Sequence, residues 1–335
     1  MSTMSIGLSM FGAMLVLMAV RVPIAISMFV PGAVGYMALA GWLPLLSHLK
    51  GAVYSRVSIY DLSVIPLFML MGAFAVHGGL SKALFDFANA LLGRFKGGMA
   101  MAGVLACAAF GSISGSTVAT TATIAQVAYP EMRRINYSGR LATAALATGG
   151  TMGVLLPPSV TLMVYAILTE QNITKMFLAA YIPALIAAVG YLIAIAVIVR
   201  IHPDQAPQAK AATASELMTT AVNVWPIAAI FLVVFGGIYG GVFTATEGAA
   251  IGNVLTFAIT LLRREMTFDK LVASIRTTAQ TSGMIFLIFI GADMINASLA
   301  LSQLPAQLAD MVGHLQISPL VVMAGIMIFY IILGC

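Results

Sequence analysis

Long apolar segments that carry almost no charge constrain the fold of this chain more than any other feature. A helix of about 20 such residues crosses the hydrocarbon core of a bilayer and satisfies its own backbone hydrogen bonds. The sequence therefore predicts an all-α, polytopic membrane protein. The segments that fit this length are residues 4–20, 22–46, 61–78, 177–200, 222–240, 247–262 and 278–301.

The composition excludes several classes of protein. Only 8% of the 335 residues are charged and 61% are hydrophobic, whereas soluble domains carry about 25% charged residues. The net charge of +5 rests on 16 Lys and Arg residues, too few for a nucleic-acid-binding surface. The two cysteines, Cys107 and Cys335, lack the spacing of metal ligands.

Enzymatic function finds no support in the motifs. The sequence contains neither HExxH nor the nucleotide-binding pattern GxxxxGK[ST]. We therefore expect a protein that is not an enzyme and that has no cofactor.

Two apolar stretches are interrupted in the middle. Residues 97–129 are broken by the run from Gly111 to Thr117, which leaves two pieces too short to cross a bilayer alone. This pattern predicts a re-entrant helical hairpin. Residues 141–169 contain Pro157-Pro158 after a glycine cluster, which predicts a broken helix, because proline lacks the N–H that a helix needs.

The basic residues support one topology. If the hairpin opens toward the cytoplasm, only Lys50, Arg56 and Lys175 of the 16 Lys and Arg residues lie outside, as the positive-inside rule requires. Residues 80–95 and 303–316 are amphipathic, typical of helices at the membrane interface.

The chain has the pattern of an inverted repeat. Gly72-Ala73 and Gly291-Ala292 precede the two amphipathic segments at an offset of 219, and other short matches have similar offsets. We predict a first repeat at 1–200, a cytoplasmic linker at 201–221 and a second repeat at 222–335. Proteins with inverted repeats place ion and substrate sites on discontinuous helices near the bilayer midplane.

Oxygen atoms at the two interruptions could hold a cation. Serine hydroxyls and unpaired carbonyls at the hairpin tip and before Pro157 would form an oxygen cage suited to Na⁺. The helix that starts near Thr117 would offer its positive end to an anion. Close packing of small residues at the tip and a simple proline kink are the structural alternatives.

Two further groups stand out. Asp293 is an ionisable residue in an apolar span; it is either part of a substrate site or a residue at the membrane boundary. Thr244 or Thr246 can cap a helix beginning at Glu247, and we favour this structural role over substrate binding.

Three ordered motifs closely resemble one family. They are FGSISGSTVAT at 110–120, GGTMGVLLPPS at 149–159 and GVFTATE at 241–247. They are similar to the large membrane subunit (DctM type) of tripartite ATP-independent periplasmic (TRAP) transporters. The resemblance implies an elevator-type, Na⁺-coupled carrier in the bacterial inner membrane. It also implies a small membrane subunit (DctQ type) and a periplasmic solute-binding protein (DctP type) that delivers an organic acid, such as a C4-dicarboxylate or a sialic acid.

The resemblance also assigns site residues. For Na⁺ it implies the hairpin serines, backbone carbonyls of the broken helix and a second site in the second repeat: Ser112, Ser114, Ser116, Gly153, Leu156, Pro157 and Gly334. We expect Thr117 and Asp293 to bind substrate. Members of the family continue beyond the equivalent of residue 335, so we expect a large subunit that is truncated at its C-terminus. A Na⁺/anion symporter without a binding protein and a non-transporting membrane scaffold are the alternative functions.

Overall fold

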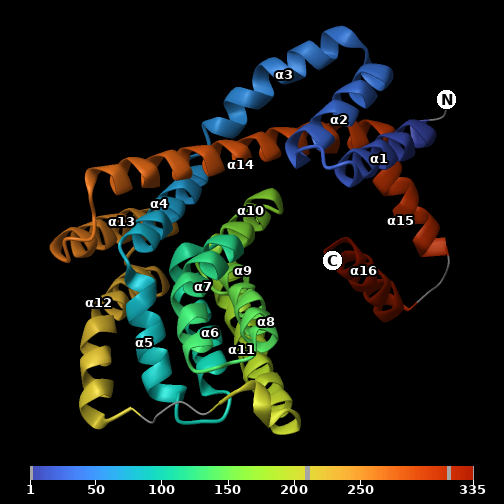
Figure 1. Cartoon of the computed structure of the whole chain (residues 1–335). Coiled ribbons are helices and arrows are strands. Elements are labelled where there is room, and N and C mark those ends of the chain that lie inside the picture. Colours follow the sequence, from blue (N-terminus) through green and yellow to red (C-terminus); the bar gives the residue numbers. More distant parts are fainter. Residues whose placement is uncertain (1–2, 208–211, 315–317, 335) are drawn as a thin grey trace. The chain divides into compact units, whose positions relative to one another are not determined.

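The computed structural model describes residues 3–207, 212–314 and 318–334, and every regular element in these ranges is a helix (Figure 1). Six helical segments among them are long and apolar enough to cross a membrane: Tyr60–His77, Gly139–Leu168, Ile173–Ile201, Ala214–Tyr239, Ala245–Leu262 and Phe268–Ser302. The predicted all-α, polytopic fold is therefore confirmed.

The chain divides into two compact units, Met1–Ser58 with Gly283–Cys335, and Ile59–Ser282. The first contains α1 (Thr3–Ala19), α2 (Ile24–Ala40), α3 (Trp42–Val57), α15 (Leu304–His314) and α16 (Pro319–Gly334). Helix α14 (Phe268–Ser302) contributes to both units. This division reflects contacts between residues and not similarity between two halves of the chain. It therefore does not test the predicted repeat, which stays a prediction.

The second unit contains the remaining helices. They are α4 (Val64–His77), α5 (Leu80–Leu92), α6 (Gly98–Ser114), α7 (Thr117–Arg134), α8 (Gly139–Gly150), α9 (Met152–Leu155), α10 (Val160–Leu168), α11 (Ile173–Ile201), α12 (Ala214–Tyr239) and α13 (Ala245–Leu262). Two 3₁₀ helices, Tyr60–Ser63 and Pro203–Gln205, precede α4 and follow α11.

Helix α6 lies at the centre of the second unit. It contacts α4, α5, α7, α8, α9 and α11, and Figure 1 shows α6, α7 and α8 side by side. Its sequence is rich in Gly and Ala, which let neighbouring helices approach closely. Phe110 and Ile113 are nevertheless almost fully buried, so the hairpin forms the core of this unit.

Close packing of small residues also holds the first unit together. A methyl group added at Gly32 of α2 would lie 2.8 Å from the backbone nitrogen of Ile295 in α14. The Ser298 hydroxyl of α14 lies 2.9 Å from the sulfur of Met10 in α1. The C-terminal part of α14 therefore packs directly on α1 and α2.

Several predicted boundaries are wrong. Residues 22–46 form two helices instead of one span, because Gly41 adopts a φ of 92° that an L-residue rarely takes. Within the linker predicted at 201–221, helix α12 already begins at Ala214, where Thr213 caps it.

The predicted interfacial helix at 80–95 forms as α5, Leu80–Leu92. Part of its apolar side is buried against α6 and α12. The second amphipathic segment forms as α15.

Candidate functional site

The hairpin turn is much tighter than the sequence suggested. Helix α6 continues through Ser114, and only Gly115 and Ser116 separate it from α7. Gly115 has a φ of 60°, and its N–H donates to the carbonyl of Gly111 at 2.9 Å. The expectation that the backbone is unwound from Gly111 to Thr117 is therefore wrong, whereas the helical hairpin itself is confirmed.

Hydroxyl groups meet inside the turn. The Ser114 hydroxyl lies 2.6 Å from the Thr120 hydroxyl, and both residues are buried. The Ser116 N–H donates to the Ser114 hydroxyl at 3.5 Å. The Ser112 carbonyl therefore lacks its usual helical donor, since that donor would be the N–H of Ser116.

The hairpin touches the broken helix through glycines. A methyl group added at Gly111 would lie 2.6 Å from the Cα of Gly153. One added at Gly153 would lie 2.8 Å from the Thr120 hydroxyl and 2.9 Å from the Ser116 carbonyl oxygen. The backbone of α9 therefore approaches both arms of the hairpin, and no larger residue fits at either glycine without displacing its neighbours.

The broken helix leaves carbonyl groups without helical partners. Helix α9 ends at Leu155 and α10 begins at Val160, with Pro157 and Pro158 between them. The helical partners of the Gly153 and Val154 carbonyls would be the N–H groups of these two prolines, and proline has none. The predicted break is confirmed, and it supplies neutral oxygen ligands of the kind that alkali cations prefer.

Two helix N-termini lie close to these oxygens. Ser116 caps α7 by accepting a hydrogen bond from the N–H of Ala119, and Ser159 caps α10 by accepting one from Leu162. A methyl group at Gly115 would lie 2.7 Å from the Pro158 carbonyl oxygen, so the two N-termini are neighbours. Helix N-termini favour anions, and they lie here beside carbonyls and hydroxyls that favour a cation.

The structure separates the predicted sodium ligands. Ser114, Ser116 and Gly153 come together at the hairpin turn, as described above. The Ser112 side chain instead donates to the Ala109 carbonyl at 2.7 Å and lines an apolar cavity. Leu156 has its side chain in an apolar cluster with Met152, so only its backbone is available as a ligand.

The other predicted residues lie in different settings. Pro157 is buried within the break. Thr117 is the first residue of α7, next to Val118, which is 79% exposed. Asp293 belongs to the first unit, where its carboxylate lies 3.6 Å from the imidazole of His48. Gly334 is the last residue of α16, and Cys335 lies outside the described residues.

Thr120 is a site residue that sequence reasoning missed. It lies one turn after Ser116, and its hydroxyl faces both Ser114 and Gly153. The sequence did contain a signal for this role. Thr120 belongs to the motif at 110–120 and lies four residues after the helix cap Ser116, on the same face of α7.

The GVFTATE segment has the predicted structural role. Thr244 caps α13, and the Glu247 carboxylate accepts hydrogen bonds from the Thr244 N–H at 2.8 Å and from its hydroxyl at 2.9 Å. This is a capping box, and it begins at Thr244 rather than at Thr246.

The candidate site contains neutral oxygens rather than charged ligands. Within the described ranges, no three His, Cys, Asp or Glu side chains cluster in a way that could hold a metal ion. The oxygen atoms at the hairpin are hard ligands, unlike the thiolate and imidazole groups that hold most transition metals.

Comparison with known proteins decides the family. Residues 11–335 match the family described as "Tripartite ATP-independent periplasmic transporter, DctM component". The chain belongs to the DctM family. With its apolar helices, it is a multi-pass protein of the bacterial inner membrane.

Relatives within the DctM family differ in the solutes that their names state. The chain is 32% identical to the C4-dicarboxylate TRAP transporter large permease protein DctM of Pseudomonas aeruginosa, over 82% of this chain and 64% of the relative. It is 30% identical to the 2,3-diketo-L-gulonate large permease protein YiaN of Escherichia coli, over 96% and 75%. It is 25% identical to the ectoine/5-hydroxyectoine large permease protein UehC of Ruegeria pomeroyi, over 98% and 76%.

The chain spans only part of the length of these proteins. The matched share is 64% of the Pseudomonas aeruginosa relative and 53% of the C4-dicarboxylate large permease of Vibrio cholerae. The hairpin and the broken helix both lie within the matched family region.

Proposed function

We propose that this chain is the large membrane subunit of a Na⁺-coupled importer of organic acids. The observation that carries the proposal is the meeting of the hairpin turn with the Pro157-Pro158 break in a chain of the DctM family. The solutes in the names of all four relatives mentioned above are carboxylates or contain a carboxylate group. An organic acid is therefore the solute class that we propose.

Neutral oxygens around the turn would bind Na⁺. The proposed ligands are the hydroxyls of Ser114 and Thr120. The backbone carbonyl oxygens of the following residues would be further ligands: Ser112, Gly153, Leu156 and Pro157. The C-terminal end of α6 adds the negative pole of a helix dipole at the same place. A bound Na⁺ would supply positive charge at this site without any change in the protonation or oxidation state of the protein.

The carboxylate of the solute would bind beside the cation. The first N–H groups of α7 and α10 have no partner within their helices apart from the caps Ser116 and Ser159. They form a positive pole near Thr117, where the exposed Val118 leaves one side open. Na⁺ beside this pole would raise the affinity for a carboxylate, which couples the two solutes.

The hairpin and the broken helix would move as one body. The contacts of Gly111 and Gly153 join α6, α7 and α9 through backbone atoms, and such an interface cannot slide without separating. This rigidity fits an elevator movement, in which the site crosses the membrane with its helices. A small membrane subunit and a periplasmic solute-binding protein would complete the transporter.

Uptake into proteoliposomes tests this function. The complete transporter would be reconstituted with its binding protein, and radiolabelled succinate would serve as a representative C4-dicarboxylate, beside sialic acid and ectoine. We expect uptake of at least one of these solutes that requires an inward Na⁺ gradient, without ATP. Uptake that continues unchanged when choline replaces Na⁺ would contradict Na⁺ coupling. Uptake that does not need the binding protein would contradict the tripartite assignment.

A further inference from the structure

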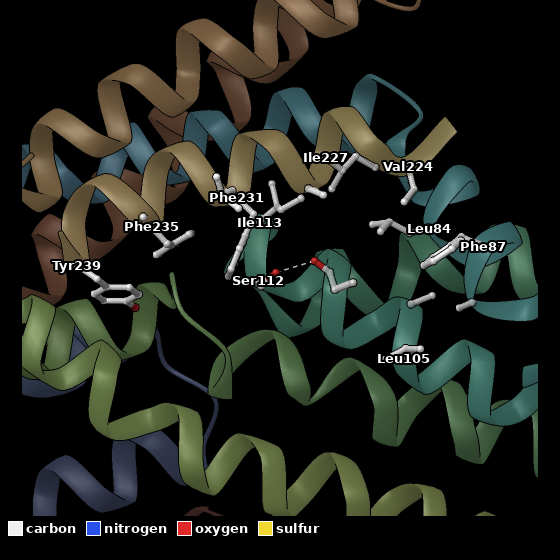
Figure 2. Close-up of a pocket in the computed structure, with 16 residues that line it drawn as sticks. Leu84, Phe87, Leu105, Ser112, Ile113, Val224, Ile227, Phe231, Phe235 and Tyr239 are labelled. Carbon is white, nitrogen blue, oxygen red and sulfur yellow. Dashed lines mark hydrogen bonds between the residues drawn. The ribbon is translucent and has the colours of Figure 1, made fainter. Parts of the chain in front are cut away.

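An apolar cavity of about 670 Å³ lies within the second unit, between α5, α6 and α12 (Figure 2). Leu84 and Phe87 of α5 form one wall, and the aromatic residues Phe231, Phe235 and Tyr239 of α12 form the opposite one. Ser112 lines this cavity, and the other proposed sodium ligands lie outside its lining. A volume of this size is typical of a ligand site.

The cavity has no free polar group for a polar ligand to recognise. Its polar side chains are Ser112 and Tyr239. The Ser112 hydroxyl donates to the Ala109 carbonyl at 2.7 Å, and the Tyr239 hydroxyl donates to that of Tyr181 at 3.3 Å. Because protein partners already satisfy both donors, the ligand that fits the cavity is a hydrocarbon.

The shape of the cavity suits a long, flexible chain. Val224 and Tyr239 line its opposite ends (Figure 2). These residues are 15 positions apart on one helix, which corresponds to about 22 Å at 1.5 Å per residue. An acyl chain spans one leaflet, roughly 15 Å of hydrocarbon, so the groove is long enough for a whole chain.

The cavity can be reached sideways from the bilayer. Leu232 at its rim is 73% exposed and Leu105 is 38% exposed, and both lie on helices rich in apolar residues. Hydrocarbon can therefore enter without first crossing water.

A cation contacts α12 one residue before the cavity-lining stretch begins. The guanidinium of Arg263, at the end of α13, donates a hydrogen bond to the carbonyl of Asn223. Asn223 immediately precedes Val224, which lines the cavity. A guanidinium binds phosphate through several N–H groups at once. Apolar walls with an arginine nearby match the chemistry of a phospholipid.

We infer that the groove between α5, α6 and α12 binds one acyl chain of a membrane phospholipid, with the lipid phosphate beside Arg263. The assignment goes beyond the proposed transport function and does not depend on Na⁺ or on the solute. The bound chain would contact the Ile113 side of α6 and fill the space between the hairpin and α12.

Lipid retention tests the assignment. The complete transporter would be purified from membranes, and the phospholipid that stays bound would be measured by native mass spectrometry. Gly236→Phe is the filling variant, since a Cβ at Gly236 meets no atom within 4 Å and the ring can enter the groove. Val233→Phe is the matched control, because Val233 is 41% exposed on the same helix but does not line the cavity.

We expect roughly tenfold less retained phospholipid in Gly236→Phe and in Arg263→Ala, and unchanged retention in Val233→Phe. Thermal unfolding would confirm that each variant is folded, and Ala228→Leu replaces Gly236→Phe if the latter fails to fold. Equal retention in the wild type and a folded filling variant would overturn the assignment, as would loss of lipid in Val233→Phe alone. Retention of free fatty acid in place of phospholipid would also overturn it.

Crosslinking provides an independent readout. The transporter would be placed in vesicles of phosphatidylethanolamine and phosphatidylglycerol that contain a phospholipid with a diazirine in its acyl chain. We expect labelling of the peptide around Phe231 that saturates and is competed by unlabelled lipid. Labelling of this peptide that never saturates would overturn the assignment.

Discussion

Single glycines determine how closely the backbones meet at the candidate site. Gly111 and Gly153 face one another across α6 and α9, and a methyl group at Gly111 would lie 2.6 Å from the Cα of Gly153. Backbone atoms would have to move to relieve this overlap, since the atoms nearest to the added methyl group belong to the backbone and not to a flexible side chain. The identity of these residues therefore controls whether the hairpin can reach the broken helix.

Gly111→Ala is expected to destabilise the protein by about 1–3 kcal/mol, the usual cost of overpacking. Gly190→Ala is the matched control, because a Cβ at Gly190 of α11 meets no atom within 4 Å. It should leave stability unchanged or raise it slightly through helix propensity. Thermal unfolding in detergent measures both. An unchanged melting temperature for Gly111→Ala would show that the close contact does not exist in solution.

Asp86 of α5 gives a prediction about pH. Burial raises the pKa of this carboxyl group; Lys82 opposes the shift and Glu131 adds to it. The unfolded chain therefore ionises this group at a lower pH than the folded protein does, and stability falls as pH rises through that interval. Asp86→Asn should raise the melting temperature at pH 7, with a smaller effect below about pH 4, near the ordinary pKa of aspartate. An equal gain at both pH values would contradict this account.

The local effect of a residue on its own helix could be predicted from the sequence, whereas the direction of a side chain could not. Pro157 and Pro158 break a helix wherever they occur in it, so the interruption was predictable. Ser112 and Ser114 look equivalent in sequence, yet one lines the cavity and the other meets Thr120. Their roles depend on how far α6 continues, and this is set by the tight turn at Gly115.

At the scale of helices, caps and left-handed residues define the boundaries. Thr244 and Glu247 form the capping box of α13, as the sequence predicted. The break at Gly41 was missed, because a glycine in an apolar run is also compatible with a continuous helix. Its positive φ decides between these possibilities, and sequence alone does not report that angle.

The two predicted repeats share a helical order. Helices α4, α5 and α6 correspond to α14, α15 and α16 in this prediction. Gly79 between α4 and α5 has a φ of 67°, and Gln303 between α14 and α15 has a φ of 55°. Positive φ also occurs at other helix junctions of this chain, such as Gly97 and Gly115, so the repeat stays a prediction.

Removing the cap of α13 is expected to cost about 1 kcal/mol of stability. In Thr244→Ala the N–H of Glu247 loses its acceptor, and the carboxylate loses a donor. Thr219→Ala is the control, since that hydroxyl bonds only to the Ser215 carbonyl one turn earlier in α12. The melting temperature should fall in the first variant and stay nearly constant in the second; the reverse order would rule out a stabilising cap.

For the whole molecule, the proposed cation site combines two interrupted elements. The hairpin would contribute hydroxyls and the broken helix carbonyls, and two helix N-termini would provide a neighbouring place for a carboxylate. Membership of the DctM family connects this arrangement to transport. The substrate could not be predicted from these residues, because backbone N–H groups bind any carboxylate.

The Na⁺ dependence of uptake in site variants tests this claim most directly. In the complete transporter, Ser114→Ala and Thr120→Val should raise the Na⁺ concentration for half-maximal uptake roughly tenfold, since each removes one proposed ligand. Ser112→Ala should behave like the wild type, because its side chain faces the cavity and its backbone carbonyl is retained. Unchanged Na⁺ dependence in both of the first two variants, or a loss confined to Ser112→Ala, would contradict a sodium site at the hairpin turn.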